Sequence, residues 1–183
     1  LTDGVIRTQE NVGAFRSQML NSHNGKLLRI SPVTGDGIAS NPFYDASAPR
    51  SAKSRVWALG FRNPFRDSVK PGTGSTNPLR GDIGEVFVGD VGWNLWEELN
   101  IVKAPGTNFG WSLYEGHTAQ TGYTAFETQN GDEPNTFGTC SGRANYRFKD
   151  LLRQDNSAGD KSVYNPCNSS QLIGTNNRYI HAR

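Results

Sequence analysis

Short apolar segments separated by turn residues limit what this chain can fold into. Glycine supplies 21 and proline 9 of the 183 residues, and turn dipeptides such as Asn24-Gly25 and Pro71-Gly72 stand between the apolar segments. These dipeptides favour turns and interrupt helices. The pattern predicts a mostly β protein and argues against a helical bundle or a coiled coil, which would be rich in Ala, Leu, Glu and Lys.

The composition argues against three other classes of protein. Nine Phe, six Tyr and four Trp supply core material, and the net charge is only +2, so disorder is not expected. No apolar run approaches the roughly 18 residues that a membrane helix needs. The Lys and Arg residues are dispersed along the chain, which argues against a nucleic-acid partner.

Residues 55–113 form the most regular stretch of the sequence. We expect strands near 63–70, 84–90, 98–103 and 108–113, joined by glycine-containing turns. Short strands at a spacing of about 10–15 residues indicate an antiparallel meander. Radial packing of such sheets as propeller blades covers both of their faces, and a β-sandwich is the alternative.

The segments on either side of this expected blade are less regular. Residues 26–31 predict a short strand, and the polar, turn-rich residues 114–160 predict a loop-rich insertion. The chain begins with Leu1 rather than methionine, and residues 178–183 resemble the start of a strand. We therefore interpret it as a fragment truncated at both ends, in which the lack of a signal peptide says nothing about localisation.

Two cysteines, Cys140 and Cys167, are too few for a disulfide scaffold and lack the spacing of a metal site. A bridge between them would close a loop of about 27 residues and stabilise the fold by about 3–4 kcal/mol in the chain-entropy model. Two free buried thiols are the alternative. A glycosylation-type sequon at 168–170 gives weak support for an exported protein.

Arg62 and Asn63 stand directly before Pro64. The proline favours an extended conformation at Asn63 and so indicates the start of a strand. In a propeller, strand ends open on the central channel, where an arginine fork can bind a ligand that carries several carboxylates. The alternative is an arginine that pairs with a nearby carboxylate and ties down a loop.

The turn at 90–94 is rich in glycine and is followed by two carboxylates, Glu97 and Glu98. Glycine allows backbone carbonyls to converge, and Ca²⁺ binds carbonyl and carboxylate oxygens in flexible geometry. The spacing of an EF-hand is absent, and packing is the default role of the two aromatic residues Trp93 and Trp96. No nucleophile motif is visible, and the isolated histidines are expected at the surface rather than as catalytic bases; these are His23, His117 and His181.

Three blocks of this sequence resemble one family. They are 24–30 (NGKLLRI), 57–66 (WALGFRNPFR) and 89–102, the last followed by NFGW at 108–111. In order and spacing they are similar to the glucose/sorbosone dehydrogenase family, whose members are six-bladed β-propellers. Many are exported quinoproteins that use pyrroloquinoline quinone (PQQ) and Ca²⁺. The resemblance implies that residues 1–183 form part of an all-β propeller, with about two four-stranded blades, one of them over 55–113, and part of a third.

The resemblance also implies a binding site. Arg62 and Asn63 match positions that contact PQQ, Gly92 and Trp93 match the pair whose carbonyls hold the cofactor Ca²⁺, and Glu98 matches an acidic ligand of a second, structural Ca²⁺. The implied reaction is oxidation of a sugar or similar alcohol by hydride transfer to the quinone, with an external electron acceptor. The implied location is secreted, periplasmic or extracellular.

The chain departs from the best-studied enzymes at two positions of these blocks. It has Phe65 where they have glutamine, and Trp93 where they have proline, although a carbonyl ligand tolerates the second change. The family's catalytic histidine is expected upstream of this chain and further basic PQQ ligands downstream, so the fragment alone is expected to be inactive. The Asn-Pro-aromatic-Arg form and the Gly-Asp-Val-Gly block also resemble the propeller of hedgehog-interacting protein. The alternative is therefore a non-catalytic extracellular propeller that binds a protein partner.

Overall fold

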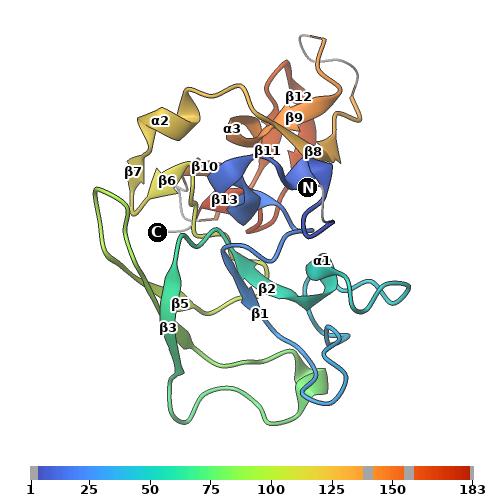
Figure 1. Ribbon diagram of the computed structural model, residues 1–183, viewed down its shortest axis with the longest axis vertical. Coiled ribbons are helices and arrows are strands. Elements are labelled where there is room, and N and C mark those ends of the chain that lie inside the picture. The colour runs from blue at the N-terminus through green and yellow to red at the C-terminus, as the bar shows by residue number, and fades with distance from the viewer. Residues whose placement is uncertain (1–3, 138–141, 155–158, 182–183) are drawn as a thin grey trace.

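The structure, a computed structural model, describes residues 4–137, 142–154 and 159–181 and consists mainly of short strands (Figure 1). No helix in this part of the chain is longer than six residues or able to span a membrane. The elements in chain order are η1 (Thr8–Glu10), η2 (Gly13–Gln18), β1 (Lys26–Leu28), α1 (Ala52–Arg55), β2 (Val56–Leu59), β3 (Pro64–Val69), η3 (Pro78–Arg80), β4 (Val86–Asp90), β5 (Glu98–Val102), β6 (Tyr114–Glu115), β7 (Thr118–Ala119), α2 (Thr121–Thr124), β8 (Gln129–Pro134), β9 (Asn145–Arg147), α3 (Phe148–Leu151), β10 (Arg153–Gln154), β11 (Val163–Asn165), β12 (Asn168–Gly174) and β13 (Ile180–His181). The expected all-β class is confirmed.

The antiparallel meander β3-β4-β5 forms a three-stranded sheet. Its strands confirm three of the expected segments, and Asp90 at the end of β4 pairs with Pro64 on one side and Glu98 on the other. Alternate residues of β4 are buried, since Val86 and Val88 face the core. This alternation is the period-two signal of a strand with one buried face.

The expectation of a fourth strand over 108–113 is wrong. Only Asn108 forms a bridge there, and its side-chain oxygen accepts a hydrogen bond from the Gly110 N–H at 3.0 Å. Gly110 has a φ of 95°, and its carbonyl accepts from Leu113 and Tyr114 in a turn. Local bonding by the Asn side chain and the left-handed glycine therefore replace the ladder of a strand. The sheet has three strands instead of four, and a six-bladed arrangement remains a prediction.

A parallel seam joins segments that are distant in the sequence. Asn108 bridges Leu59 on one side and His181 on the other, both in parallel orientation. The Leu59 N–H donates to Thr107 at 3.0 Å, and the Phe109 N–H donates to Leu59 at 2.9 Å. β1 lies antiparallel to β2, and β10 lies parallel to β13, at the two edges of the same seam. The seam thus brings together the N-terminal, central and C-terminal parts of the described chain.

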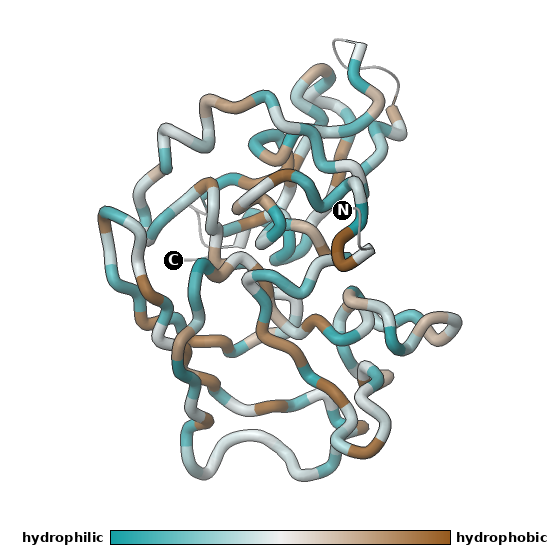
Figure 2. Tube along the Cα trace, in the orientation of Figure 1, coloured by the Kyte–Doolittle hydropathy of each residue, from teal (hydrophilic) through white to brown (hydrophobic). Residues whose placement is uncertain are grey.

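The described residues contain three buried apolar clusters, of which the smallest consists of Leu20, Val56 and Leu59. Another contains Trp57 and Phe61 with the buried face of β4, and the third stacks Phe15 on Phe148 at 4.8 Å. Figure 2 colours several strand segments brown, whereas the loop after β3, at the bottom of the view, is mostly pale or teal. The sequence therefore places its apolar residues in the short strands and leaves the connections polar.

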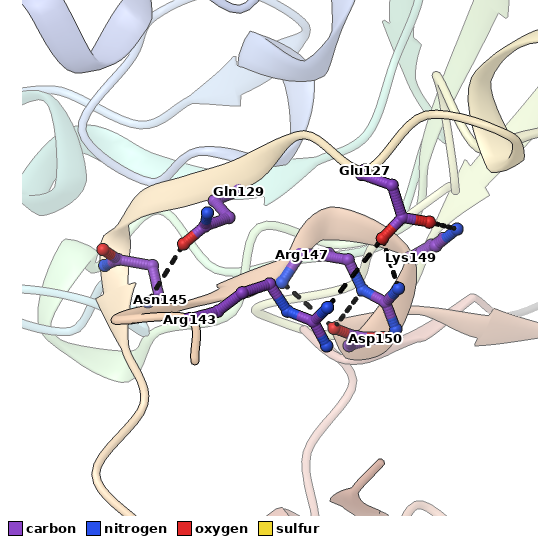
Figure 3. A network of polar contacts seen from close by, with 7 residues as sticks. All are labelled: Glu127, Gln129, Arg143, Asn145, Arg147, Lys149 and Asp150. Carbon is purple, nitrogen blue, oxygen red and sulfur yellow. Dashed lines mark hydrogen bonds and ion pairs between the residues drawn. The ribbon is translucent and has the colours of Figure 1, made fainter. Parts of the chain in front are cut away.

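Residues 114–160, expected as a loop-rich insertion, contain several two- to six-residue elements from β6 to β10. Arg7 connects this region to η1, since its two terminal nitrogens donate to both oxygens of Asp132 at 2.9 Å. A second network connects the segment before β8 to β9 and α3 (Figure 3). There Glu127 accepts from Arg147 and Lys149, and Arg147 also pairs with Asp150 at 2.6 Å. Because the Glu127 side chain is exposed, we assign this network to local order rather than to major stability.

The predicted disulfide falls at the edge of the described region. Cys140 lies outside the described residues, so its bridge to Cys167 stays a prediction. Cys167 stands between β11 and β12, which form an antiparallel pair.

Candidate functional site

Residues of η2, of the turn before β1 and of the segment before β3 surround a pocket of about 490 Å³. Its rings come from Trp93, Trp111 and Tyr123, and its cationic side chains from Arg16 and Arg62. We call this cavity the arginine pocket. It brings together three of the predicted site residues, namely Arg62, Asn63 and Trp93.

Asp90 fixes the backbone of the two predicted cofactor residues. Its Oδ2 accepts from the Arg62 N–H at 2.9 Å, and its Oδ1 accepts from the Asn63 N–H at 2.7 Å. Val91 donates in turn to the Asn63 carbonyl at 3.1 Å. Asp90 is only 2% exposed. Burial raises the pKa of its carboxyl, while the two backbone N–H groups act in the opposite direction. The Asp90 carboxylate therefore fixes the positions of two consecutive backbone N–H groups, those of Arg62 and Asn63, at the rim of the pocket.

The Arg62 side chain ties the chain locally and also faces the pocket. Its Nη1 donates to the Val91 carbonyl at 2.9 Å, and its guanidinium lies 5.6 Å from the centre of the Trp111 ring. The loop-tying alternative is thus partly right, although the acceptor of the guanidinium is a carbonyl rather than a carboxylate. A guanidinium has five N–H donors, so this bond leaves the group able to hold a ligand as well.

Three aromatic rings form one wall of the arginine pocket. The centre of the Trp93 ring lies 5.9 Å from Trp111 and 5.5 Å from Tyr123, and the last two are 5.4 Å apart. The rings are strongly tilted toward one another, which is a favourable arrangement for aromatic quadrupoles. Tyr123 also packs edge-on against Phe15 of the core. The wall is thus anchored to the interior, while Trp93 remains 49% exposed and able to contact a ligand.

The predicted calcium turn has a tightly constrained backbone. A Cβ on Gly92 would lie 1.9 Å from the Trp96 carbonyl oxygen, so no other residue fits there without a shift. The Gly92 N–H donates to Glu97 at 3.1 Å, and the Trp93 and Asn94 N–H groups donate to the buried Glu115. Residues 92–97 line a second, smaller cavity of about 160 Å³. The carboxylates of Glu97 and Glu115 therefore accept hydrogen bonds from the backbone N–H groups of this turn.

Glu98, the predicted ligand of a second calcium, lines neither cavity. One of its oxygens accepts from the Gly116 N–H and the other from Asn100 at 3.3 Å. Burial raises the pKa of its carboxyl, and Asp90 and Glu115 act in the same direction. The described residues contain no group of three or more His, Cys, Asp or Glu side chains able to hold a metal. A calcium ion at 92–93 would thus depend on main-chain oxygens.

The expectation that all three histidines lie at the surface is wrong for His181, which is buried. It belongs to the parallel seam, stacks on Tyr114 and lies 2.9 Å from the Gly116 carbonyl through Nε2. His23 and His117 are exposed, as expected.

The sequence alone did not indicate several residues that build the site. Asp90 and Glu115 are its backbone anchors, and Arg16, Trp111 and Tyr123 line the pocket. The sequence signal for Asp90 was its position at the end of the expected strand 84–90, directly before the glycine-containing turn. Arg16 and Tyr123 reach the pocket only through tertiary structure, since they are distant in the sequence and η2 packs against Tyr123 through Phe15.

The fold and the pocket define a β-sheet protein with a cationic, aromatic-lined pocket. The chain belongs to the glucose/sorbosone dehydrogenase family, whose sequence model matches residues 5–140. It is 31% identical to the HIPL2 protein of Arabidopsis thaliana over 108 residues, which cover 50% of this chain and 14% of that protein. It is 33% identical to the HIPL1 protein of the same plant over 76 residues, which cover 42% and 9%. No solved structure matches.

Proposed function

We propose that the protein is a PQQ- and Ca²⁺-dependent dehydrogenase that oxidises a sugar or related alcohol and passes electrons to an external acceptor. Membership of the glucose/sorbosone dehydrogenase family supports the proposal. The observation that carries it is the meeting of Arg62, Asn63 and Trp93 around one pocket. The matches cover only a small part of the two relatives, so the activity is proposed for the whole protein rather than for this chain alone.

The residues of the arginine pocket fit PQQ, a planar tricarboxylate. Arg16 and Arg62 line the pocket, and none of its described lining residues is Asp or Glu, while Asp90 holds the backbone of two of them. The tilted rings provide apolar contact for a flat ligand. When bound, the cofactor supplies a quinone that accepts a hydride, and Ca²⁺ supplies a Lewis acid.

This chain would contribute binding and orientation. Asp90 holds the backbone of Arg62 and Asn63, so that their side chains meet a ligand without reorganisation. The Arg62 guanidinium would balance carboxylate charge. The carbonyls of Gly92 and Trp93 would hold the metal, and Glu98 would hold a second, structural calcium.

Reconstitution tests this function. The purified full-length protein is incubated with PQQ and Ca²⁺, and dye reduction is followed with a panel of aldoses. Arg62→Gln is expected to lower the activity at limiting PQQ, whereas Arg66→Gln is the matched control, since Arg66 lies over Phe65 outside the pocket. Absence of sugar-dependent dye reduction in the unaltered protein under all these conditions would reject the dehydrogenase.

The second candidate is a non-catalytic extracellular propeller that binds a protein partner. The outward face of β5 supports it, since Leu99 is 68% exposed and Ile101 lies beside it on the same face. Isolated exposed apolar residues are common, but neighbours on one sheet face are typical of contact surfaces. Failure to bind PQQ in the reconstitution would favour this candidate.

We also propose that the protein is exported to a secreted, periplasmic or extracellular location. The family membership and the predicted bridge between Cys140 and Cys167 support this proposal, because disulfides persist in oxidising compartments. Fractionation of the producing cells tests it, and recovery of the protein solely from the cytosol would contradict it.

A further inference from the structure

We propose that Arg16 is a second anchor for an anionic ligand in the arginine pocket, and that the pocket selects planar aromatic carboxylates. The proposal rests on the proposed function, because it concerns the same pocket. It adds a residue, Arg16, that the sequence motifs do not indicate.

The charge of the pocket lining is the first observation. The side chains of Arg16 and Arg62 carry two positive charges, and no carboxylate among the described residues lines the cavity. Behind the lining, burial lowers the pKa of Lys26 to about 7, and its amino group donates to the carbonyls of Ser17 at 2.7 Å and Asn24 at 2.6 Å. Both of these residues line the pocket. Asp90 accepts from the backbone N–H groups of Arg62 and Asn63, so the two guanidinium groups are the charges that the lining itself offers to an anionic ligand.

The placement of Arg16 is the second observation. Its Nε donates to the Gly13 carbonyl at 3.1 Å within η2, and its own carbonyl accepts from Lys26 at 3.1 Å. Both backbone and side chain of this arginine are thus held before any ligand arrives. Preorganisation reduces the entropy cost of binding, and the planar guanidinium matches a carboxylate.

The aromatic wall is the third observation, and it restricts the ligand class. Trp93, Trp111 and Tyr123 present ring surfaces beside the two guanidinium groups. A small anion such as inorganic phosphate would use the arginines but not the rings. A planar ring that carries several carboxylates would contact both kinds of group.

Fluorescence titration of the tryptophans tests the proposal with a readout that needs no turnover. The probes are PQQ, benzene-1,3,5-tricarboxylate as an aromatic tricarboxylate without a quinone, and inorganic phosphate. Arg16→Gln is expected to weaken both tricarboxylates about 10-fold or more, in the range of a lost charge-assisted hydrogen bond. Arg66→Gln, outside the pocket, is expected to leave them unchanged. Circular dichroism checks that each variant is folded.

Equal tricarboxylate affinity in Arg16→Gln and the unaltered protein would overturn the role of Arg16. Phosphate binding as tight as that of the tricarboxylates would overturn the aromatic class. Sugar-dependent dye reduction together with unchanged PQQ affinity in Arg16→Gln would reject this inference and leave the dehydrogenase standing. Arg16-dependent tricarboxylate binding without sugar oxidation would reject the dehydrogenase and leave this inference standing.

Discussion

Replacement of Asp90 by alanine should destabilise the fold and disturb the arginine pocket at the same time. The carboxylate is buried and accepts the N–H groups of Arg62 and Asn63 at 2.9 and 2.7 Å. Alanine would leave both donors without this acceptor and would release the chain just before β3. The pocket loses the support of two lining residues in the same step.

The size of the effect follows from those two bonds. A hydrogen bond to a charged group contributes roughly 1.5–3 kcal/mol. The burial that raises the pKa of Asp90 offsets part of this gain. We therefore expect Asp90→Ala to lower the free energy of unfolding by about 2–4 kcal/mol. Asp90→Asn keeps one acceptor and is expected to cost about half as much.

Urea unfolding followed by tryptophan fluorescence measures this change. Asp67→Ala is the matched control, because Asp67 is an exposed residue of the neighbouring strand β3, and its expected effect is within about 0.5 kcal/mol. An unfolding midpoint of Asp90→Ala equal to that of the control would refute the role of Asp90 as a backbone anchor.

Three further predictions concern the sheet, the seam and the cysteines. Burial raises the pKa of Glu98, so the folded state binds a proton more tightly than the unfolded state. The stability advantage of the unaltered protein over Glu98→Gln should therefore decrease as the pH rises from about 4 toward neutrality. An advantage in urea unfolding that stays constant or grows would contradict this. Gly110→Ala should lower the melting temperature and reduce the free energy of unfolding by at least about 1 kcal/mol. Gly110 has a left-handed backbone, and a Cβ there would lie 2.5 Å from His181. An unchanged melting temperature would show that the seam is looser than described. Thiol titration in denaturant without reductant should find no free thiol at Cys140 and Cys167, and two reactive thiols would exclude the bridge.

The local sequence pattern predicted the strands of the meander correctly. It failed over 108–113, where a side chain forms the hydrogen bonds that a strand would form with its neighbour. The alternation in 84–90 and the short apolar segment at 98–103 predicted β4 and β5. Asn108 and Gly110 looked like the start of a fourth strand, but the amide side chain and the left-handed glycine turn the chain instead. The same Asn108 forms the parallel seam with Leu59 and His181, which depends on contacts between distant segments.

The candidate site divides in the same way. The proline after Asn63 marked a strand start and placed Arg62 and Asn63 correctly at the edge of β3. Their anchor, Asp90, lies 28 and 27 residues further along the chain, a distance that no local motif spans. Arg16 and Tyr123 enter the pocket only because η2 and α2 pack beside it.

The binding of PQQ with and without Ca²⁺ tests the proposed function most directly. Carbonyls carry no net charge, so the turn at Gly92 and Trp93 would hold Ca²⁺ weakly until the cofactor supplies negative charge. Calorimetric titration of the protein with PQQ should therefore give tighter binding in the presence of Ca²⁺, and Arg62→Ala should weaken that binding by about 1.5–3 kcal/mol. PQQ binding that Ca²⁺ leaves unchanged, or no PQQ binding at all, would contradict the dehydrogenase and favour the protein-binding propeller.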